Sequence, residues 1–166
     1  HRLSSDMNKI RLFVDHTLGE AQSVPLNKDQ AHYIFSVMRK RIGDLILIFD
    51  GNNGEWLASL NEISKQNGNL LCIKQTKPQI NPPDLWLYFS PLKKTRTDFI
   101  IEKATELGVR KIIPIQTERT NADRIRIDRL NAHAREAAEQ CGGTYIPKIF
   151  ELQKLNEALK NFPSDR

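Results

Sequence analysis

Residues 85–116, LWLYFSPLKKTRTDFIIEKATELGVRKIIPIQ, decide the fold, because the spacing of their apolar residues changes twice within this short stretch. Leu85–Phe89 is an apolar run that predicts a fully buried strand. A helix is expected next, capped by Thr97 and ended by Gly108. The apolar side of this helix consists of Ile100, Ile101, Ala104 and Leu107. Val109–Ile115 is the next predicted strand, and this order of elements predicts an α/β domain with a parallel sheet and right-handed crossovers.

The alternation of helices and strands continues to the end of the sequence. A second helix is predicted from about Asp128 to Cys141, where Gly142-Gly143 ends it. Tyr145–Ile149 is the third predicted strand, and Pro147 within it favours an edge position or a strand end. A last amphipathic helix has its apolar side at Leu152, Leu155, Leu159 and Phe162. No strand follows this helix, so we expect that the C-terminal part of the sheet is missing.

The residues before this region have the pattern of short β-strands. The predicted strands lie at residues 10–14, 45–49, 55–60 and 70–73. One helix interrupts them, begun by the capping-box pair Asn27 and Gln30 and ended by Arg39-Lys40-Arg41, whose charges suit the negative end of the helix dipole. The apolar side of that helix is formed by Ala31, Ile34, Phe35 and Met38. Short strands of this spacing predict a small β-barrel.

A proline-rich stretch separates the two patterns. Lys77–Asp84 holds three prolines, at positions 78, 82 and 83, and such a sequence is excluded from helix interiors and central strands. We therefore predict a β-barrel domain over residues 1–77, an extended linker over residues 78–84 and an α/β domain over residues 85–166.

The composition describes a globular chain with a mild excess of positive charge. The 166 residues are 39% hydrophobic and 27% charged, which is enough for one good core or two small ones. Residues 1–84 hold 10 Lys and Arg against 9 Asp and Glu, whereas residues 85–166 hold 15 against 11. The net charge of +5 by itself supports a polyanionic partner only weakly.

Several classes of protein are excluded by residue usage. Cys72 and Cys141 are the two cysteines and form no C-x-x-C pair, so neither a disulfide scaffold nor a cysteine zinc site is expected, and a reducing cytoplasm is the natural setting. The four histidines have no metal-ligand spacing, and His32 is expected on a helix surface. No apolar run reaches the roughly 20 residues that span a bilayer. Cys141 is interpreted as a packed thiol, since nothing in the sequence places a base beside it.

Two basic loops are predicted at the carboxyl ends of the first two α/β strands, where open parallel sheets bind ligands. Residues 90–96 contain Lys93, Lys94 and Arg96, and residues 116–126 contain Arg119, Arg124 and Arg126. A single loop of this kind is more often a solvated surface, whereas two on one edge favour a phosphate-bearing ligand such as RNA. Arg39-Lys40-Arg41 is open to both readings, a helix-dipole interaction or a contact to RNA phosphates.

Three groups of residues resemble the RsmE family of RNA methyltransferases. The first group is Arg11-Leu12-Phe13-Val14, His32, Val37-Met38-Arg39, Gly43-Asp44 and Phe49-Asp50-Gly51. The second and most specific group is Lys103-Ala104-Thr105-Glu106-Leu107-Gly108-Val109, Ile113-Pro114 and Thr117-Glu118-Arg119. The third group is Ala137-Ala138-Glu139-Gln140-Cys141-Gly142 with Pro147 beyond it. The resemblance extends from Arg11 to about Phe162.

The resemblance implies a PUA-like RNA-binding β-barrel followed by a SPOUT (trefoil-knotted, Rossmann-like) domain that is incomplete at its C-terminus. It further implies transfer of a methyl group from S-adenosylmethionine to uridine N3 of 16S ribosomal RNA in the small ribosomal subunit, by a cytoplasmic homodimer. The sequence departs from the family at Gly143, where an arginine is usual. The Gly-Pro-Glu-Gly-Gly loop and the knot that bind the cofactor are expected beyond Arg166, so the 166-residue chain is expected to be inactive alone.

The chemistry assigns roles within this resemblance. Removing the N3 proton of uridine leaves negative charge on the base, and a nearby cation stabilises that charge. Arg119 is the candidate for this role or for phosphate binding, and Glu118 is a candidate base, although packing by Glu118 is an equal alternative. Arg11 and Arg39 match family positions and are candidate phosphate contacts. The alternatives are a non-catalytic RNA-binding protein or fragment, and an α/β domain with an unknown partner.

Overall fold

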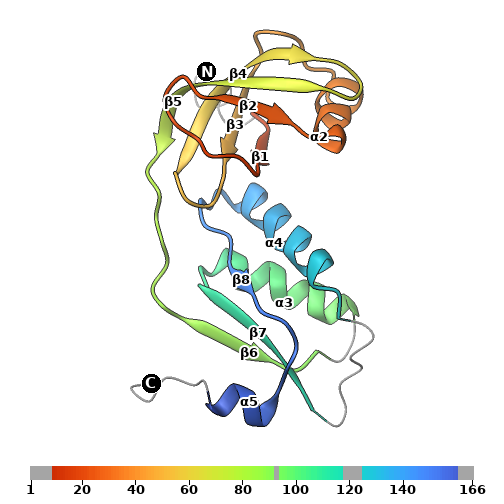
Figure 1. Ribbon diagram of the computed structural model, residues 1–166, viewed down its shortest axis with the longest axis vertical. Helices are drawn as coiled ribbons and strands as arrows, with labels where there is room; N and C mark the ends of the chain where they lie inside the picture. The colour runs from red at the N-terminus through yellow and green to blue at the C-terminus, as the bar shows by residue number, and fades with distance from the viewer. Residues whose placement is uncertain (1–8, 92–93, 118–124, 161–166) are drawn as a thin grey trace. The chain divides into compact units, whose positions relative to one another are not determined.

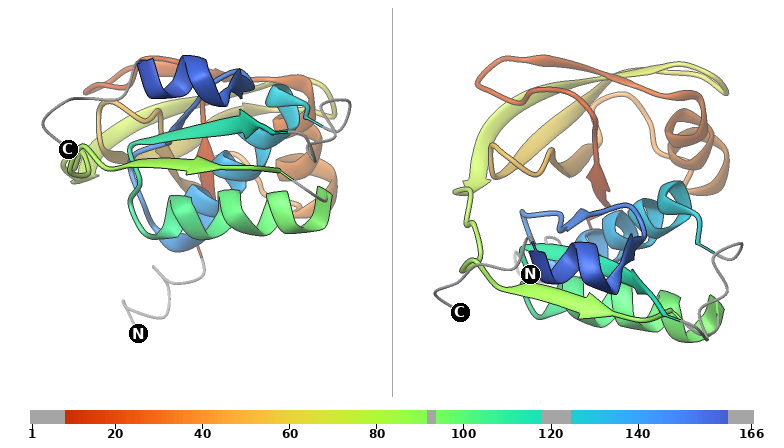
Figure 2. Two further views of the ribbon diagram at one scale, coloured as in Figure 1. Left: turned by 90° about the horizontal axis from the view of Figure 1, so that it is seen from below. Right: turned by 60° about the horizontal axis from the view of Figure 1, so that its bottom comes forward.

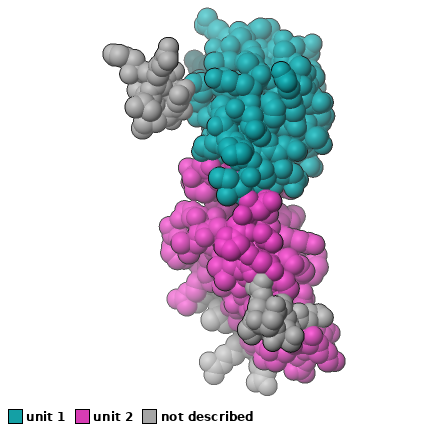
Figure 3. Space-filling model, turned by 90° about the vertical axis from the view of Figure 1, so that its left-hand side faces the viewer, with its two compact units in different colours: residues 1–80 teal, residues 81–166 magenta. Residues whose placement is uncertain are grey.

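The computed structural model describes residues 9–91, 94–117 and 125–160, without the side chains of Lys94 and Thr95. The chain forms two compact units, residues 1–80 and residues 81–166, which Figure 3 colours separately. Unit 1 contains a five-stranded sheet and a short helical segment, and unit 2 contains a parallel sheet and three helices. None of the described helices is long and apolar enough to cross a membrane.

The sheet of unit 1 has the strand order β1-β3-β4-β5-β2 (Figure 1). Its strands are β1 (Arg11–Phe13), β2 (Ser23–Leu26), β3 (Leu45–Phe49), β4 (Glu55–Ile63) and β5 (Gly68–Lys77). β1 pairs with β3 in parallel, while the other neighbours are antiparallel. The predicted alternation at the first strand is confirmed, since Ile10, Leu12 and Val14 are all buried. The core of this unit therefore gathers alternate residues of each strand on one face.

The helix of unit 1 begins as the sequence predicts and ends differently. In α2 (Lys28–His32), Asn27 and Gln30 form both hydrogen bonds of a capping box. The chain then widens into a π-helix, η1 (Tyr33–Val37), and this wider turn displaces the apolar stripe. Ala31 and Ile34 are fully buried, but Phe35 and Met38 are exposed, so that part of the predicted apolar side is wrong.

The sheet of unit 2 is parallel throughout, as the alternation of elements predicts. Its strands are β6 (Trp86–Phe89), β7 (Lys111–Gln116), β8 (Lys148–Ile149) and β9 (Gln153–Lys154), with β7 between β6 and the pair β8 and β9. The prediction of a fully buried first strand is wrong: β6 pairs with β7 alone among the described strands, and every residue in it is only half-buried. Leu85, placed in that strand from the sequence, precedes it and is exposed.

Three helices cover the two faces of this sheet (Figures 1 and 2). They are α3 (Lys94–Glu106), α4 (Ile127–Cys141) and α5 (Leu155–Lys160). α3 and α4 pack on one face, around Ile101, Ile112 and Leu130, whereas α5 packs on the other through Ala158. Gly108 and Gly142 end α3 and α4 in the left-handed conformation, with φ of 77° and 81°, as predicted.

Two sequence predictions about these helices are wrong. α3 begins at Lys94, so Thr97 lies within the helix and is buried rather than capping it. In α5 the buried residue is Ala158, while Leu155 and Leu159 are exposed. The predicted Phe162 of that helix lies outside the described residues.

Candidate functional site

Both basic loops leave the parallel sheet at the same edge. β6 and β7 pair in parallel up to Phe89 and Pro114, and β7 continues to Gln116, so Ser90 and Thr117 each directly follow the carboxyl end of a strand. The hydroxyl oxygens of Ser90 and Thr117 lie 3.3 Å apart, a hydrogen-bond distance. The prediction that the two loops share one edge is therefore confirmed. We call this edge, at the carboxyl ends of β6 and β7, the carboxyl rim.

Some of the predicted cations can be placed beside the carboxyl rim. Arg96 is exposed near the start of α3, and Arg126 is exposed directly before α4. Arg126 forms an ion pair with Asp128 at 3.2 Å, but both side chains are at least 70% exposed, so this pair is weak and leaves Arg126 available to a stronger anion. Lys94 is described only as the first residue of α3. Lys93, Glu118, Arg119 and Arg124 lie outside the described residues, and their predicted roles stay predictions.

A third strand end at the rim brings in a lysine that the sequence did not single out. β9 pairs with the last residues of β7 in parallel, with Gln116 opposite Lys154. Lys154 is exposed, and it lies one register position before Thr117. The sequence does not predict β9, because a strand of two polar residues shows no alternation of apolar and polar residues. Its place depends on pairing with β7 alone.

The starts of α3 and α4 are tied together beside the rim. One carboxylate oxygen of Asp98, on α3, lies 3.3 Å from a guanidinium nitrogen of Arg129 and 3.3 Å from the Nε2 of His133, both on α4. The side chain of Asp98 is only 22% exposed, so these contacts are partly shielded from water. Polar contacts thus link the two helices that begin at the rim.

The glycines of unit 2 lie at the opposite end of the sheet from the rim. Gly108 precedes β7, and Gly142 and Gly143 precede β8, so all three lie toward the amino ends of strands. The glycine-rich turns that bind dinucleotides in open parallel sheets lie at the carboxyl ends of strands. Among residues 9–91, 94–117 and 125–160, no glycine of unit 2 lies at the carboxyl rim, and no group of His, Cys, Asp and Glu is suited to a metal ion.

The basic run of unit 1 follows η1 in a defined conformation. Arg39 has a φ of +53°, in the left-handed region, so the chain turns sharply at this residue. The backbone N–H of Lys40 donates to the carbonyl of Ile34 at 2.9 Å, and that of Arg41 donates to the Asp44 carboxylate at 2.8 Å. Arg39 and Arg41 are exposed and Lys40 is half-buried. The predicted helix therefore ends before this run rather than in it.

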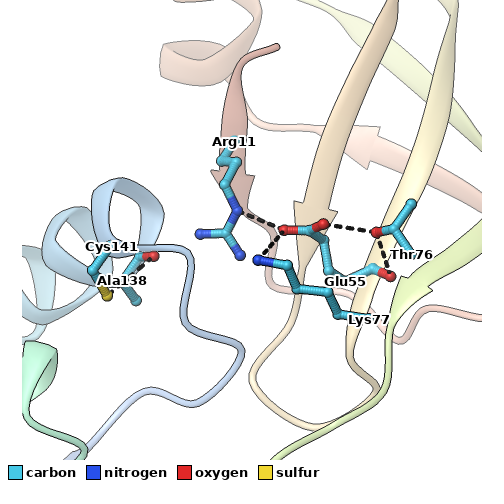
Figure 4. A network of polar contacts seen from close by, with 6 residues as sticks. All are labelled: Arg11, Glu55, Thr76, Lys77, Ala138 and Cys141. Carbon is cyan, nitrogen blue, oxygen red and sulfur yellow. Dashed lines mark hydrogen bonds and ion pairs between the residues drawn. The ribbon is translucent and has the colours of Figure 1, made fainter. Parts of the chain in front are cut away.

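Arg11 has a well-defined partner inside unit 1 (Figure 4). Its Nε donates to the Glu55 carboxylate at 2.6 Å, and its guanidinium carbon lies 4.5 Å from the centre of the Phe49 ring. The Glu55 side chain is 3% exposed and also accepts from the Thr76 hydroxyl at 2.7 Å, with the Lys77 ammonium 3.8 Å away. A contact from Arg11 to RNA stays a prediction, but most of this side chain is committed to holding β1 against β4.

The two cysteines differ in environment. Cys72 is buried in unit 1, and burial raises the pKa of its thiol above the ordinary value, with the nearby Asp50 charge adding to the increase and the backbone of Gly19 opposing it. Cys141 is exposed at the end of α4, with its sulfur 3.8 Å from the Ala138 carbonyl oxygen (Figure 4). The interpretation of Cys141 as a packed thiol is therefore wrong.

Both units match models of known protein families. The model of an RNA methyltransferase domain matches residues 79–166, and that of an RNA methyltransferase PUA domain matches residues 26–70. Two proteins named ribosomal RNA small subunit methyltransferase E are similar to the chain. The one from Rickettsia conorii is 30% identical over 151 residues, and the one from Bacillus subtilis is 28% identical over 160. Each match covers 90% of this chain and 62% of the relative, so the chain spans about three fifths of their length.

Solved structures agree with the family models. The crystal structure of a ribosomal RNA small subunit methyltransferase E from Neisseria gonorrhoeae bound to S-adenosyl methionine superposes with a TM-score of 0.83 at 27% identity, covering 95% of this chain and 67% of that one. A predicted RNA methyltransferase from Thermotoga maritima gives a TM-score of 0.76 at 29% identity, covering 88% and 66%. The fold is thus the PUA-like plus SPOUT arrangement of these proteins. The chain belongs to the RNA methyltransferase family that includes the ribosomal RNA small subunit methyltransferase E proteins.

Proposed function

We propose that this chain is the RNA-binding and substrate-positioning part of an S-adenosylmethionine-dependent methyltransferase that modifies N3 of a uridine in 16S ribosomal RNA of the small subunit. The observation that carries the proposal is the carboxyl rim, where strands β6, β7 and β9 end side by side and two basic loops begin. Similarity to the ribosomal RNA small subunit methyltransferase E proteins supports the substrate class. We further propose residues 1–77 as the RNA-binding domain, joined by residues 78–84 to a catalytic domain of a cytoplasmic homodimer.

The rim is proposed to hold the RNA through its phosphates. Arg96, Arg126 and Lys154 are exposed cations beside it, drawn from three different segments of unit 2. Phosphate contacts of this kind fix the position of an RNA without reading its sequence. Lys93, Lys94 and Arg124 are proposed to act in the same way from the loops, and Arg39, Lys40 and Arg41 from unit 1.

The reaction places a demand on the residues after Thr117. Methylation at N3 requires loss of the N3 proton, and the charge that remains is shared between N3 and the two neighbouring carbonyl oxygens of the base. A guanidinium placed at those oxygens stabilises this charge, and a carboxylate within hydrogen-bond reach of N3–H accepts the proton. We propose Arg119 for the first role and Glu118 for the second, because both directly follow the strand end at Thr117.

None of the described residues is assigned to holding S-adenosylmethionine, because the glycines of unit 2 lie away from the carboxyl rim. In keeping with this, the 166 residues contain no Gly-Pro-Glu-Gly-Gly sequence, the cofactor loop that the family resemblance implies. We therefore propose that the 166-residue chain alone binds RNA without methylating it. The binding of RNA and the transfer of the methyl group are then separable in experiment.

The test compares this chain with the full product of its gene. Each is incubated with unmodified 16S RNA or small subunits and labelled S-adenosylmethionine, and the modified nucleotide is located by the stop that an N3-methyluridine causes in reverse transcription. The proposal expects methylation by the full product at one uridine and none by the 166-residue chain. RNA binding without methylation by either protein would favour a non-catalytic RNA-binding protein. Methylation by the 166-residue chain would contradict the proposal.

The role of Arg119 has its own test in the full gene product. Arg119→Gln is expected to lower the rate of methylation far more than the affinity for RNA, because its charge acts on the developing anion. Arg126→Gln is the matched control, since it removes a charge that precedes α4 and is expected to weaken RNA binding instead. Equal losses of rate and affinity in Arg119→Gln would assign this residue to phosphate binding.

A further inference from the structure

Unit 1 exposes an unusual number of apolar side chains around its basic run. They are Tyr33 at 38%, Phe35 at 38%, Val37 at 57%, Met38 at 40%, Ile42 at 69% and Leu45 at 37% exposure. These six residues lie within thirteen consecutive positions, from the start of η1 to the start of β3. We call these residues together with Arg39, Lys40 and Arg41 the η1 surface. Exposed apolar side chains this close together in the sequence are a feature of binding surfaces.

Tyr33, Phe35, Val37 and Met38 belong to the π-helix or cap it, whereas Ile42 and Leu45 lie beyond it. The N–H of Met38 donates to the carbonyl of Tyr33 at 2.8 Å, five residues earlier, which closes a turn wider than that of an α-helix. Ile34 occupies the buried side of this turn with no exposed surface. Tyr33 and Phe35 flank Ile34 in the sequence, and each is 38% exposed, so most of its surface is covered by protein. Rings fixed in this manner lose little conformational entropy when a flat ligand stacks on them.

The charge of the η1 surface is positive. Residues 30–43 contain no aspartate or glutamate, and Arg39, Lys40 and Arg41 form no ion pair with any residue in the described part of the chain. The nearest acid in sequence, Asp44, has a carboxylate that already accepts the backbone N–H of Arg41. Exposed rings next to uncompensated cations suit a ligand that has both flat apolar groups and negative charge.

We propose that the η1 surface binds unpaired RNA, with bases stacked on Tyr33 and Phe35 and phosphates held by Arg39, Lys40 and Arg41. This inference rests on the proposed function and specifies which form of RNA unit 1 takes. Base-paired RNA presents its phosphates but keeps its base faces stacked inside the helix, so it would use the cations alone. Single strands use both kinds of side chain, and stacking on aromatic rings tolerates any base.

An acidic membrane surface is the main competing ligand for a basic and apolar surface. Membrane-bound amphipathic helices are usually long, whereas η1 has five residues and α2 before it has five. Ile34 and Ala31, on the same segment, point into the protein core rather than outward. The segment is thus built into the unit, and RNA fits it better than a bilayer does.

The experiment measures RNA affinity of the 166-residue chain as a function of salt, by fluorescence anisotropy with a labelled single-stranded and a labelled double-stranded RNA. The test variant is Tyr33→Leu/Phe35→Leu, which keeps apolar area and removes both rings. The matched control is Phe99→Leu, which removes an exposed ring of unit 2. Circular dichroism and thermal melting verify that all variants are folded.

The inference predicts that the double variant loses about tenfold or more in affinity for single-stranded RNA. Its affinity for double-stranded RNA and the slope of affinity against salt stay unchanged, and Phe99→Leu behaves like the parent. Arg39→Gly is used because glycine readily adopts the left-handed backbone of this residue. It is expected to lower the slope of log affinity against log salt for single-stranded RNA by about 0.7, the loss of one phosphate contact.

An unchanged single-strand affinity in the double variant would overturn the inference while leaving the proposed methylation intact. Equal losses on both RNA forms would also overturn it. The same holds if the chain binds vesicles containing phosphatidylglycerol and RNA fails to displace them, since the surface would then belong to a membrane. Failure of the full gene product to methylate 16S RNA would instead count against the proposed function.

Discussion

The Ser90 hydroxyl lies 3.3 Å from the Thr117 hydroxyl, although 27 positions separate these residues in the sequence. Each is the first residue after a strand of the parallel sheet, and each opens a basic loop. Their contact places the starts of both loops at one edge, where a ligand that touches one loop also meets the other. Arg96, Arg126 and Lys154, the described cations beside this edge, come from three separate segments of the sequence.

The rim predicts different effects for two lysines on adjoining short strands. Lys154→Ala is expected to weaken RNA binding and to reduce the slope of log affinity against log salt by about 0.7 to about 0.9, the loss of one phosphate contact. Lys148→Ala is the control, because Lys148 is exposed in β8 opposite Lys111, at the amino end of the sheet. Titrations at several salt concentrations measure both slopes. An equal effect of the two substitutions would mean that RNA is not bound at the carboxyl rim.

Arg11 is predicted to matter more for stability than for RNA binding. Arg11→Met would leave the Glu55 carboxylate, 3% exposed, without its closest cation, and breaking a buried pair in this way costs about 3 kcal/mol or more. Denaturant unfolding measures this loss. Arg41→Met is the control, since this residue is exposed and a surface substitution changes stability by less than about 0.5 kcal/mol. A stable Arg11→Met protein with a reduced salt slope for RNA would instead make Arg11 a phosphate contact.

The sequence predicts the parts of the fold in which apolar residues recur at a regular spacing or in which a capping residue marks the end of a helix. The parallel sheet, the capping box of Asn27 and Gln30, and the glycine that ends α4 all follow from local rules. The exposure of Phe35 and Met38 does not, because it depends on a π-turn that has no known sequence signal here. α3 likewise begins at Lys94, three residues before Thr97, and Thr97 is buried within it, which its suitability as a cap does not predict.

Some features of the candidate site could likewise be predicted from the sequence, and others could not. Its two loops could be placed at one edge from the order of strands and helices alone. Lys154 could not, because β9 exists only through its pairing with β7. The hydrogen bond from Arg11 to Glu55 could not be predicted from the sequence either, because the two residues are 44 positions apart and meet only when the sheet forms.

The two cysteines are predicted to react at very different rates. Cys141 is exposed and is expected to react with a thiol reagent in the folded protein, whereas Cys72 is expected to react only on unfolding. Mass spectrometry of the alkylated protein distinguishes the two sites. Rapid modification of Cys72 under native conditions would show that the sheet of unit 1 opens easily.

Cys72 also predicts a dependence of stability on alkaline pH. Burial raises the pKa of its thiol in the folded state, so folding disfavours the thiolate. Its contribution to the free energy of unfolding is therefore fully present below the ordinary thiol pKa and is lost as the pH rises above that value. Denaturant unfolding between about pH 7 and about pH 10 should show a steeper loss in the parent than in Cys72→Ala. Identical slopes would contradict the predicted linkage.

The meeting of the two basic loops at one rim is tested most directly by joining their first residues. In a Cys141→Ser background, Ser90→Cys/Thr117→Cys should form a disulfide under mild oxidation, seen as the loss of two hydrogen atoms in the intact mass. The control pair Ser90→Cys/Lys148→Cys, from opposite ends of the sheet, should stay reduced. The account predicts rapid bond formation in the first pair alone. A first pair that stays reduced, or that links no faster than the control, would contradict it.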